Sequence, residues 1–253
     1  MSITIILLCI IAFFAGLVDA IVGGGGLIQT PAGLILLPNH SVAQVIGSLK
    51  IPSFAGTFFA ARTFLKKIKI PLVRFLLFTS IAFIASFTGS FCLTLVSNQF
   101  MKPVILVVLV CIAFYTFTKK NFGQETKNEQ LHFPWYKAAL ICLMVGFYDG
   151  FIGPGAGSLL VLAFITWLGF DFLQANAHAK IVNLATNMGS IVLFTLKGSI
   201  LWPIAIPMAL CNAVGGMVGS RLALAKGNQF IRTIFLLVIM GTLCRLGYDV
   251  FLH

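Results

Sequence analysis

At residues 16–25 the chain reads G-L-V-D-A-I-V-G-G-G, and at residues 146–155 it reads G-F-Y-D-G-F-I-G-P-G. In both stretches an aspartate lies three residues after the first glycine and four residues before the next shared glycine. Glycine runs interrupt helices, because glycine has a poor helix propensity and a wide choice of backbone conformations. The two stretches therefore predict two helices that break at equivalent places.

The similarity extends over the whole chain at a constant offset of 130 residues, without gaps. Chance matches in so apolar a chain would be Leu, Ile or Phe, but the matches are mostly polar residues and glycines. A duplicated fold keeps Asp and Lys inside an apolar sequence where both copies use them, which predicts a site shared by the two halves. The matched pairs include Asp19 and Asp149, Gly23 and Gly153, Gly25 and Gly155, Gln44 and Gln174, Lys50 and Lys180, and Gly89 and Gly219.

The composition excludes a soluble domain. Of the 253 residues, 59% are hydrophobic and 9% are charged, and this apolar surface is too large for such a domain to bury. We therefore expect an all-α integral membrane protein whose partner is the lipid bilayer; the motifs described below add a small anionic substrate. The net charge of +11 is expected to face anionic lipid and not nucleic acid, because Lys and Arg gather in the loops. Whether the protein forms a homo-oligomer stays open.

Apolar runs predict a series of helices in each half. Two of them are too short to cross the hydrocarbon comfortably, and each follows a glycine-rich break, so we expect re-entrant or broken helices there. Each half then holds such a helix plus about three full transmembrane helices. The predicted helices are 3–22, 27–37, 42–64, 71–96 and 103–118, with copies at 135–152, 158–168, 174–196, 200–222 and 230–251.

The positive charges predict that the two repeats have opposite orientations in the membrane. Basic residues crowd the loop at 62–74, whereas the equivalent loop of the second half keeps only Lys197 and the loop after that is basic. Basic loops face the cytoplasm, so equivalent loops should lie on opposite faces of the membrane, as in inverted-topology repeats. We assign the first repeat to residues 1–123, a cytoplasmic linker to 124–130, and the second repeat to 131–253.

Two lysines inside apolar helices are the first candidates for function. A charge near the bilayer centre costs at least about 2.5–3.5 kcal/mol, so intramembrane lysines are functional candidates, with snorkelling to the interface as the alternative. Polar residues follow each lysine at i+3 and i+7 on one helical face, where they suit an oxyanion or a hydrogen bond between helices. The two trios are Lys50, Ser53 and Thr57, and Lys180, Asn183 and Asn187.

Asp19 and Asp149 precede the two glycine breaks. They are expected to pair with a lysine, to cap the opened backbone or to carry protons. The helices after the breaks, starting near Leu27 and Ser158, should offer N–H groups to an anion, with Gly25, Gly155 and Ser158 among the substrate-binding residues. No cofactor is expected beyond proton or ion coupling.

The remaining motifs indicate packing. The six cysteines lie in apolar runs without a C-x-x-C pair, which is typical of small buried hydrophobic residues. No cluster has metal spacing, so we expect no metal site. Small residues three or four apart should let helices approach closely; these are Ala85, Ser86, Gly89, Ser90, Gly215, Gly216, Gly219 and Ser220.

The stretches G-L-V-D-A-I-V-G-G-G-G-L at 16–27 and G-F-Y-D-G-F-I-G-P-G-A-G-S at 146–158, with A-x-x-x-x-K-I-x-N at 175–183, resemble the TauE/SafE family of sulfite and organosulfur-anion exporters. The resemblance covers essentially the whole chain. It implies a prokaryotic cytoplasmic-membrane transporter of small anions that often contain sulfur. It also implies that Lys180 with Asn183 adjoins a broken-helix core of Asp149, Gly153, Pro154, Gly155 and Gly157.

We therefore expect a multi-pass protein of the cytoplasmic membrane, and not an enzyme. Its expected function is secondary transport, as an exporter of small sulfur-containing oxyanions, by alternating access at a site between the two repeats. An anion channel would use the same residues to line a pore, and a membrane-embedded sulfur-relay protein would need a reactive cysteine. Both alternatives stay open at this point, as do the transported anion and the coupling ion.

Overall fold

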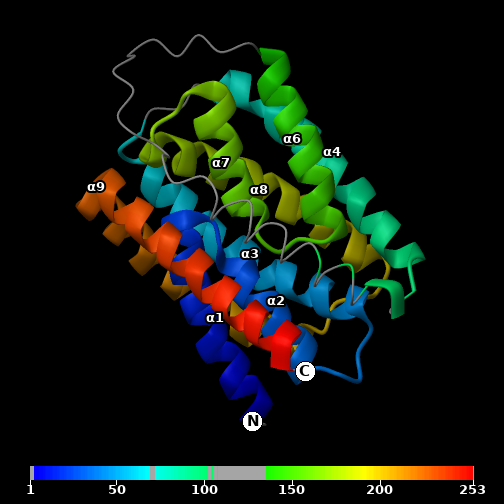
Figure 1. The fold of residues 1–253 in the computed structure, drawn as a ribbon. Helices are drawn as coiled ribbons and strands as arrows, with labels where there is room; N and C mark the ends of the chain where they lie inside the picture. Colours follow the sequence, from blue (N-terminus) through cyan, green and yellow to red (C-terminus); the bar gives the residue numbers. More distant parts are fainter. Residues whose placement is uncertain are drawn as a thin grey trace.

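The computed structural model describes residues 3–68, 72–97, 99–101, 104, 107 and 135–252. These residues form helices joined by short turns, and no strand occurs among them (Figure 1). The prediction of an all-helical chain is therefore confirmed for the described part. The helices are α1 (Ile3–Val22), α2 (Gly25–Leu36), α3 (Val42–Leu65), α4 (Leu72–Leu95), α6 (Trp135–Phe151), α7 (Ala156–Leu168), α8 (Phe172–Leu196) and α9 (Trp202–Leu252).

The predicted helix boundaries hold to within a few residues, with one correction. The short helices α2 and α7 begin at Gly25 and Ala156, two residues before the predicted starts at Leu27 and Ser158. The two helices predicted at 200–222 and 230–251 share the label α9 and are separated by a kink at Gly227, whose backbone is non-helical, so the prediction of two helices is confirmed there. The predicted linker lies outside the described residues, as does most of the predicted helix 103–118.

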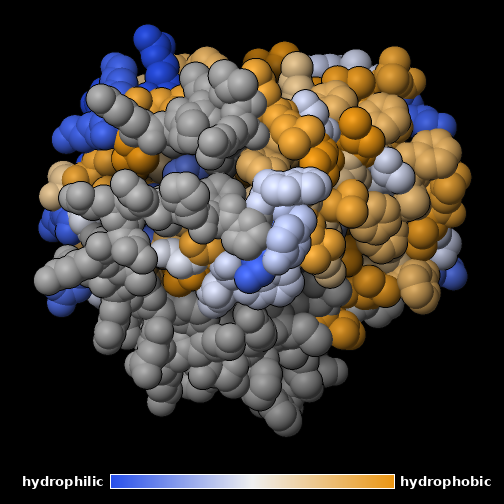
Figure 2. Space-filling view, turned by 90° about the horizontal axis from the view of Figure 1, so that it is seen from above, coloured by the Kyte–Doolittle hydropathy of each residue, from blue (hydrophilic) through white to orange (hydrophobic). Residues whose placement is uncertain are grey.

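Four described helices are long and apolar enough to cross a membrane: Ile3–Val22, Leu76–Leu95, Phe172–Leu196 and Trp202–Gly227. At about 1.5 Å per residue, α2 and α7 are about 18–20 Å long, shorter than the hydrocarbon core of about 30 Å. Apolar side chains cover much of the described surface in Figure 2, where dark blue hydrophilic side chains gather mainly toward the edge. A multi-pass membrane protein fits this surface.

The caps of α3 and α8 explain one of the repeated residue pairs. The Ser41 hydroxyl accepts from the Gln44 N–H at 3.2 Å, and the Gln44 side chain accepts from the Ser41 N–H at 3.1 Å. At the equivalent place, the Asp171 carboxylate accepts from the Gln174 N–H at 2.8 Å. Such a cap contributes about 1 kcal/mol to helix stability. The repeated glutamines therefore mark where these helices start.

Helices of one half pack against helices of the other in a reciprocal pattern. α1 packs along α9, and its equivalent α6 packs along α4, as Figure 1 shows for α4 and α6. In the same way α3 packs on α9 and α8 on α4, while α3 and α8 contact each other. This exchange places the two glycine breaks, at the ends of α1 and α6, together in the middle of the bundle.

Glycines permit this exchange. A Cβ on Gly219 would lie 2.3 Å from the Leu17 carbonyl oxygen, and a Cβ on Gly89 would lie 2.2 Å from the Phe147 carbonyl oxygen. The two contacts are related by the offset of 130 residues. Real Cβ atoms do not approach so closely, so the prediction that small residues allow close helix packing is confirmed.

Candidate functional site

The site begins where the two helix breaks touch. α1 ends at Val22, and Gly23 follows it with a φ of +81°. A Cβ on Gly23 would lie 2.4 Å from the carbonyl carbon of Gly157, and a Cβ on Gly157 would lie 2.5 Å from the Gly23 oxygen. Only glycine fits at both positions, because the backbones of the two breaks are in direct contact.

Lys50 of α3 reaches across to the break of the second half. Its Nζ donates to the Asp149 carbonyl oxygen at 2.6 Å and to Asp149 Oδ1 at 2.8 Å. Lys50 is 5% exposed and Asp149 is 3% exposed. The ammonium therefore lies in the protein interior at the C-terminal end of α6, where the helix dipole and the carboxylate both favour a cation.

Lys180 of α8 makes the equivalent contact with the first half. Its Nζ donates to Asp19 Oδ2 at 2.8 Å and to the Asp19 carbonyl oxygen. The snorkelling alternative is excluded, because both lysines are buried and paired with aspartates of the opposite half. A buried ion pair adds little net stability, but removing one partner leaves an uncompensated charge that costs about 3–5 kcal/mol.

The two aspartates differ in how well they are satisfied. Asp19 also accepts from the Gly25 N–H and from the Thr57 hydroxyl, both at 3.4 Å. Its side chain is 16% exposed, whereas that of Asp149 is 5% exposed. Oδ2 of Asp149 is buried and has no hydrogen-bond partner among the described residues. Two equivalent carboxylates therefore have unequal surroundings.

A cavity of about 40 Å³ lies between the two breaks. A cavity of that size holds about three water molecules, or an ion of a few heavy atoms. Its walls come from both halves and include both breaks and both aspartates, but only one of the two lysines. The lining residues are Asp19, Gly23, Gly26, Gln29, Thr30, Ile46, Leu49, Lys50, Ser53, Asp149, Ile152, Gly153, Gly155, Ala156, Gly157, Asn183 and Asn187.

The predicted site residues divide into two groups. Those that line the cavity are Asp19, Lys50, Ser53, Asp149, Gly155, Asn183 and Asn187. Four others are placed behind its wall: Gly25, Thr57, Ser158 and Lys180. The Ser158 hydroxyl donates to the Val22 carbonyl oxygen at 3.3 Å, and Thr57 and Gly25 hold Asp19 as described above. These four residues support the breaks in this conformation.

Donors face the cavity from equivalent positions. Asn183 Oδ1 already accepts from Asn187 Nδ2 at 3.0 Å and from the Thr186 hydroxyl at 3.4 Å, so the amide nitrogen is left as a donor. Ser53, its repeat equivalent, contributes a hydroxyl to the wall. Lys50 uses two of its three N–H groups on Asp149, which leaves one. Together these groups suit an oxyanion.

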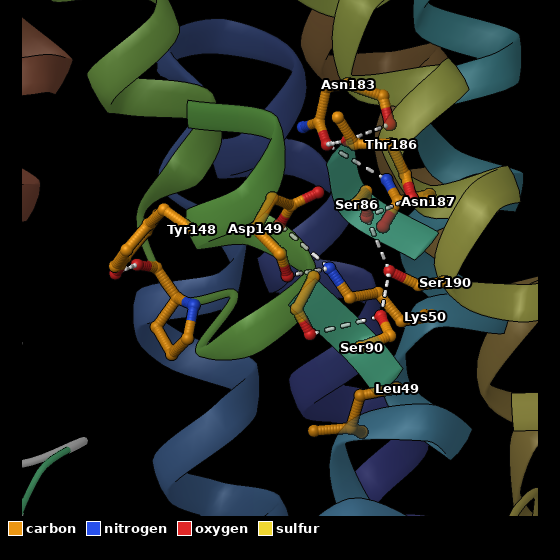
Figure 3. A network of polar contacts seen from close by, with 12 residues as sticks. Leu49, Lys50, Ser86, Ser90, Tyr148, Asp149, Asn183, Thr186, Asn187 and Ser190 are labelled. Atoms are coloured by element: carbon orange, nitrogen blue, oxygen red, sulfur yellow. Dashed lines mark hydrogen bonds and ion pairs between the residues drawn. The ribbon is translucent and has the colours of Figure 1, made fainter. Parts of the chain in front are cut away.

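A row of buried hydroxyls lies behind the asparagines, between α4 and α8 (Figure 3). The Ser86 hydroxyl donates to the Thr186 carbonyl oxygen at 2.7 Å and is 2.8 Å from the Ser190 hydroxyl. Ser90 donates to Ser190 at 2.9 Å and lies 3.1 Å from the Gly150 oxygen. These bonds join α4 and α8 to the residue that follows Asp149 and hold that break in position.

Reasoning from duplicated residues missed several polar groups. Gln29 is 2% exposed, lines the cavity and accepts from Asn212 Nδ2 at 2.9 Å. Asn176 donates to the carbonyl oxygens of Ala20 and Ile21 at 3.0 and 2.8 Å, at the end of α1. Gln29, Asn176 and Asn212 correspond to Leu159, Ile46 and Ala82. The sequence signal that could have revealed these three residues is a single amide side chain within an apolar helix.

Neither a metal site nor a reactive cysteine emerges in the described part of the chain. No group of three or more His, Cys, Asp or Glu there is arranged to hold a metal ion. Cys9, Cys92, Cys142 and Cys211 are free thiols, and none of them lines the cavity. The groups that the structure places at the breaks are hydrogen-bonding side chains, two buried ion pairs and helix termini.

Known proteins resemble this chain over most of its length. The sequence model of the family described as "Sulfite exporter TauE/SafE" matches residues 8–246. The "Probable membrane transporter protein YfcA" of Escherichia coli strain K12 is 32% identical over 240 residues, which cover 94% of this chain and 88% of that protein. The "Probable membrane transporter protein ORF9" of Sinorhizobium sp is 32% identical over 242 residues, covering 96% and 92%. No solved structure gives a significant match.

Proposed function

The chain belongs to the TauE/SafE family of membrane transporters, and from this premise we propose that it is a secondary transporter of small sulfur-containing oxyanions. It exports them across the cytoplasmic membrane by alternating access at the cavity between its two repeats. The observation that carries the proposal is the reciprocal pair of buried contacts, Lys50 with Asp149 and Lys180 with Asp19, beside a cavity lined by both helix breaks.

The proposed architecture is a pair of inverted-topology repeats, residues 1–123 and 131–253, joined by a cytoplasmic linker. The reciprocal packing of α1 on α9 and of α6 on α4 supports a two-fold relation between the repeats. The opposite charge bias of their equivalent loops supports the inversion. In such transporters one repeat moves against the other around a central site, which then opens to each side in turn.

The oxyanion is proposed to bind between the breaks. The third N–H of Lys50, the Ser53 hydroxyl and the Asn183 amide provide donors. The N-terminal residues of α2 and α7 lie in the same wall, and the positive ends of helices attract anions. The volume of about 40 Å³ favours an ion as small as sulfite in this conformation. Lys180 and Thr57 act through Asp19, which they hold in the wall.

Transport by purified protein in liposomes tests this function. Exchange of external radiolabelled sulfite for internal sulfite should be saturable and should fall at least about tenfold in Lys180→Ala, because a tenfold loss requires only about 1.4 kcal/mol. Lys197→Ala, an exposed lysine at the end of the same helix, is the matched control and should exchange at the wild-type rate. Unchanged exchange in Lys180→Ala, or single-channel currents from the wild type, would refute the proposal.

A further inference from the structure

The carboxylate of Asp149 is left half satisfied in a buried place. Its Oδ1 accepts from Lys50, whereas its Oδ2 is buried without a hydrogen-bond partner in the described part of the chain. An unpaired buried acceptor costs about 1–3 kcal/mol, and more when it is charged. Its repeat equivalent, Asp19, does not share this deficit, because both of its oxygens accept hydrogen bonds.

The charges of the two ion pairs at the cavity, Asp149 included, sum to zero. Lys50 of α3 is in contact with it, and Asp19 of α1 faces the same cavity with Lys180 of α8 bound behind it. On its own helix, the Tyr148 hydroxyl is turned to the Pro154 carbonyl oxygen. α7 carries no ionisable residue, and from α4 the Ser90 hydroxyl lies 3.1 Å from the carbonyl oxygen of the neighbouring Gly150. Apart from the helix N-termini, an anion entering this cavity therefore meets side chains with no net charge, one of which is a carboxylate in the wall.

We propose that Asp149, and not Asp19, takes up one proton with each oxyanion, which makes this protein a proton-coupled carrier. The inference rests on the proposed transport function. One proton bound at Oδ2 changes the orphan acceptor into an O–H donor, and it gives the four paired groups a net charge of one. Lys50 then has a neutral partner, so its charge is available to the anion. Figure 3 shows Asp149 and Lys50 together with Asn183 and Asn187, and all four line the cavity.

The proposed step balances in charge and protons. The proton comes from water on the side to which the cavity is open, adds to Asp149 Oδ2, and leaves to water on the other side with the anion. A monoanion with its proton carries no net charge, so the anion gradient and the pH gradient together set the direction of net transport, and the membrane potential does not. With a cytoplasm more alkaline than the outside, export proceeds while the cytoplasmic excess of the anion is larger than the ratio that the pH difference sustains. The unprotonated, empty carrier is neutral in its core and returns with both ion pairs closed.

Accumulation in liposomes at zero membrane potential tests the step. The probe is methanesulfonate, a strong-acid anion that brings no proton of its own; sulfite, counted as its bisulfite monoanion, is the second probe. For one coupled proton, wild-type protein should concentrate the monoanion about tenfold for each unit by which the lumen is more alkaline. A wild type that exchanges anions but accumulates none refutes the coupling and leaves the proposed function standing. Absence of exchange refutes both.

Asp149→Asn tests which residue binds the proton, since the amide is a permanent donor without a titratable group. Its anion exchange should be slower than that of the wild type but measurable, because Lys50 loses its charged partner, and its accumulation should be lost entirely, whereas Asp149→Glu should retain accumulation. Asp19→Asn is the matched control in the equivalent ion pair; it should exchange more slowly but reach the same tenfold ratio. Accumulation by Asp149→Asn, or its loss in Asp19→Asn alone, would overturn the assignment. If Asp149→Asn does not fold, the accumulation ratios of Asp19→Asn and Asp149→Glu still test which carboxylate binds the proton.

Discussion

Removal of Lys50 should destabilise the protein more than removal of Lys180, although the two lysines are repeat equivalents. Lys50→Met leaves the Asp149 carboxylate, 5% exposed, with no hydrogen bond from another described residue. Breaking such a buried pair costs about 3–5 kcal/mol. Lys180→Met leaves Asp19 with the Gly25 and Thr57 donors and 16% exposure. These two long hydrogen bonds retain about 1–2 kcal/mol, so we expect a cost of about 2–3 kcal/mol there.

Thermal unfolding in detergent, followed by tryptophan fluorescence, measures the difference. At about 2–4 °C per kcal/mol for a chain of this length, Lys50→Met should lower the Tm by about 10 °C or more, and Lys180→Met by about half as much. The double variant Lys50→Met with Asp149→Leu should recover most of the Tm, because an apolar pair replaces a buried ion pair at little cost. A double variant as unstable as the two single changes added together would refute the reasoning, as would a lower Tm for Lys180→Met.

Three further predictions concern the breaks and the thiols. Gly157→Ala puts a Cβ 2.5 Å from the Gly23 oxygen. It should lower the free energy of unfolding by about 1–3 kcal/mol and abolish exchange. Gly26→Ala, whose Cβ would have its nearest atom at 3.2 Å, should keep the exchange rate within a few fold of the wild type. Asn176→Leu leaves two carbonyl oxygens at the end of α1 without their hydrogen-bond donor. It should lower the free energy of unfolding by about 2–4 kcal/mol, and a variant as stable as the wild type would show that water replaces the amide. Replacement of all six cysteines by alanine should leave the exchange rate unchanged, and a lost activity would revive the sulfur-relay alternative.

Much of the architecture could be predicted because the bilayer restricts it. Backbone groups in hydrocarbon must be bonded within helices, so apolar runs and their lengths predicted the helices to within a few residues. The glycine runs predicted both breaks, with starts of α2 and α7 two residues later than observed. The offset of 130 residues also selected Asp19, Lys50, Asp149 and Lys180, since chance rarely duplicates charges in an apolar chain.

Gln29, Asn176 and Asn212 escaped the same reasoning, because each corresponds to an apolar residue in the other half. A comparison of repeats detects what the two halves share. It cannot detect groups that only one half contributes. The unpaired oxygen of Asp149 could not be detected in this way either, because Asp19 has hydrogen-bond partners that Asp149 lacks.

The sequence by itself determined which charges lie inside the membrane segments and where the helices break, because charge, glycine content and apolar length are properties of the chain alone. The tertiary structure alone decided that each lysine binds the aspartate of the opposite half, and that one carboxylate is saturated while the other keeps a free oxygen. Those partners are 99 and 161 residues apart in sequence. Only the exchange of helices between the two halves brings them within hydrogen-bond distance.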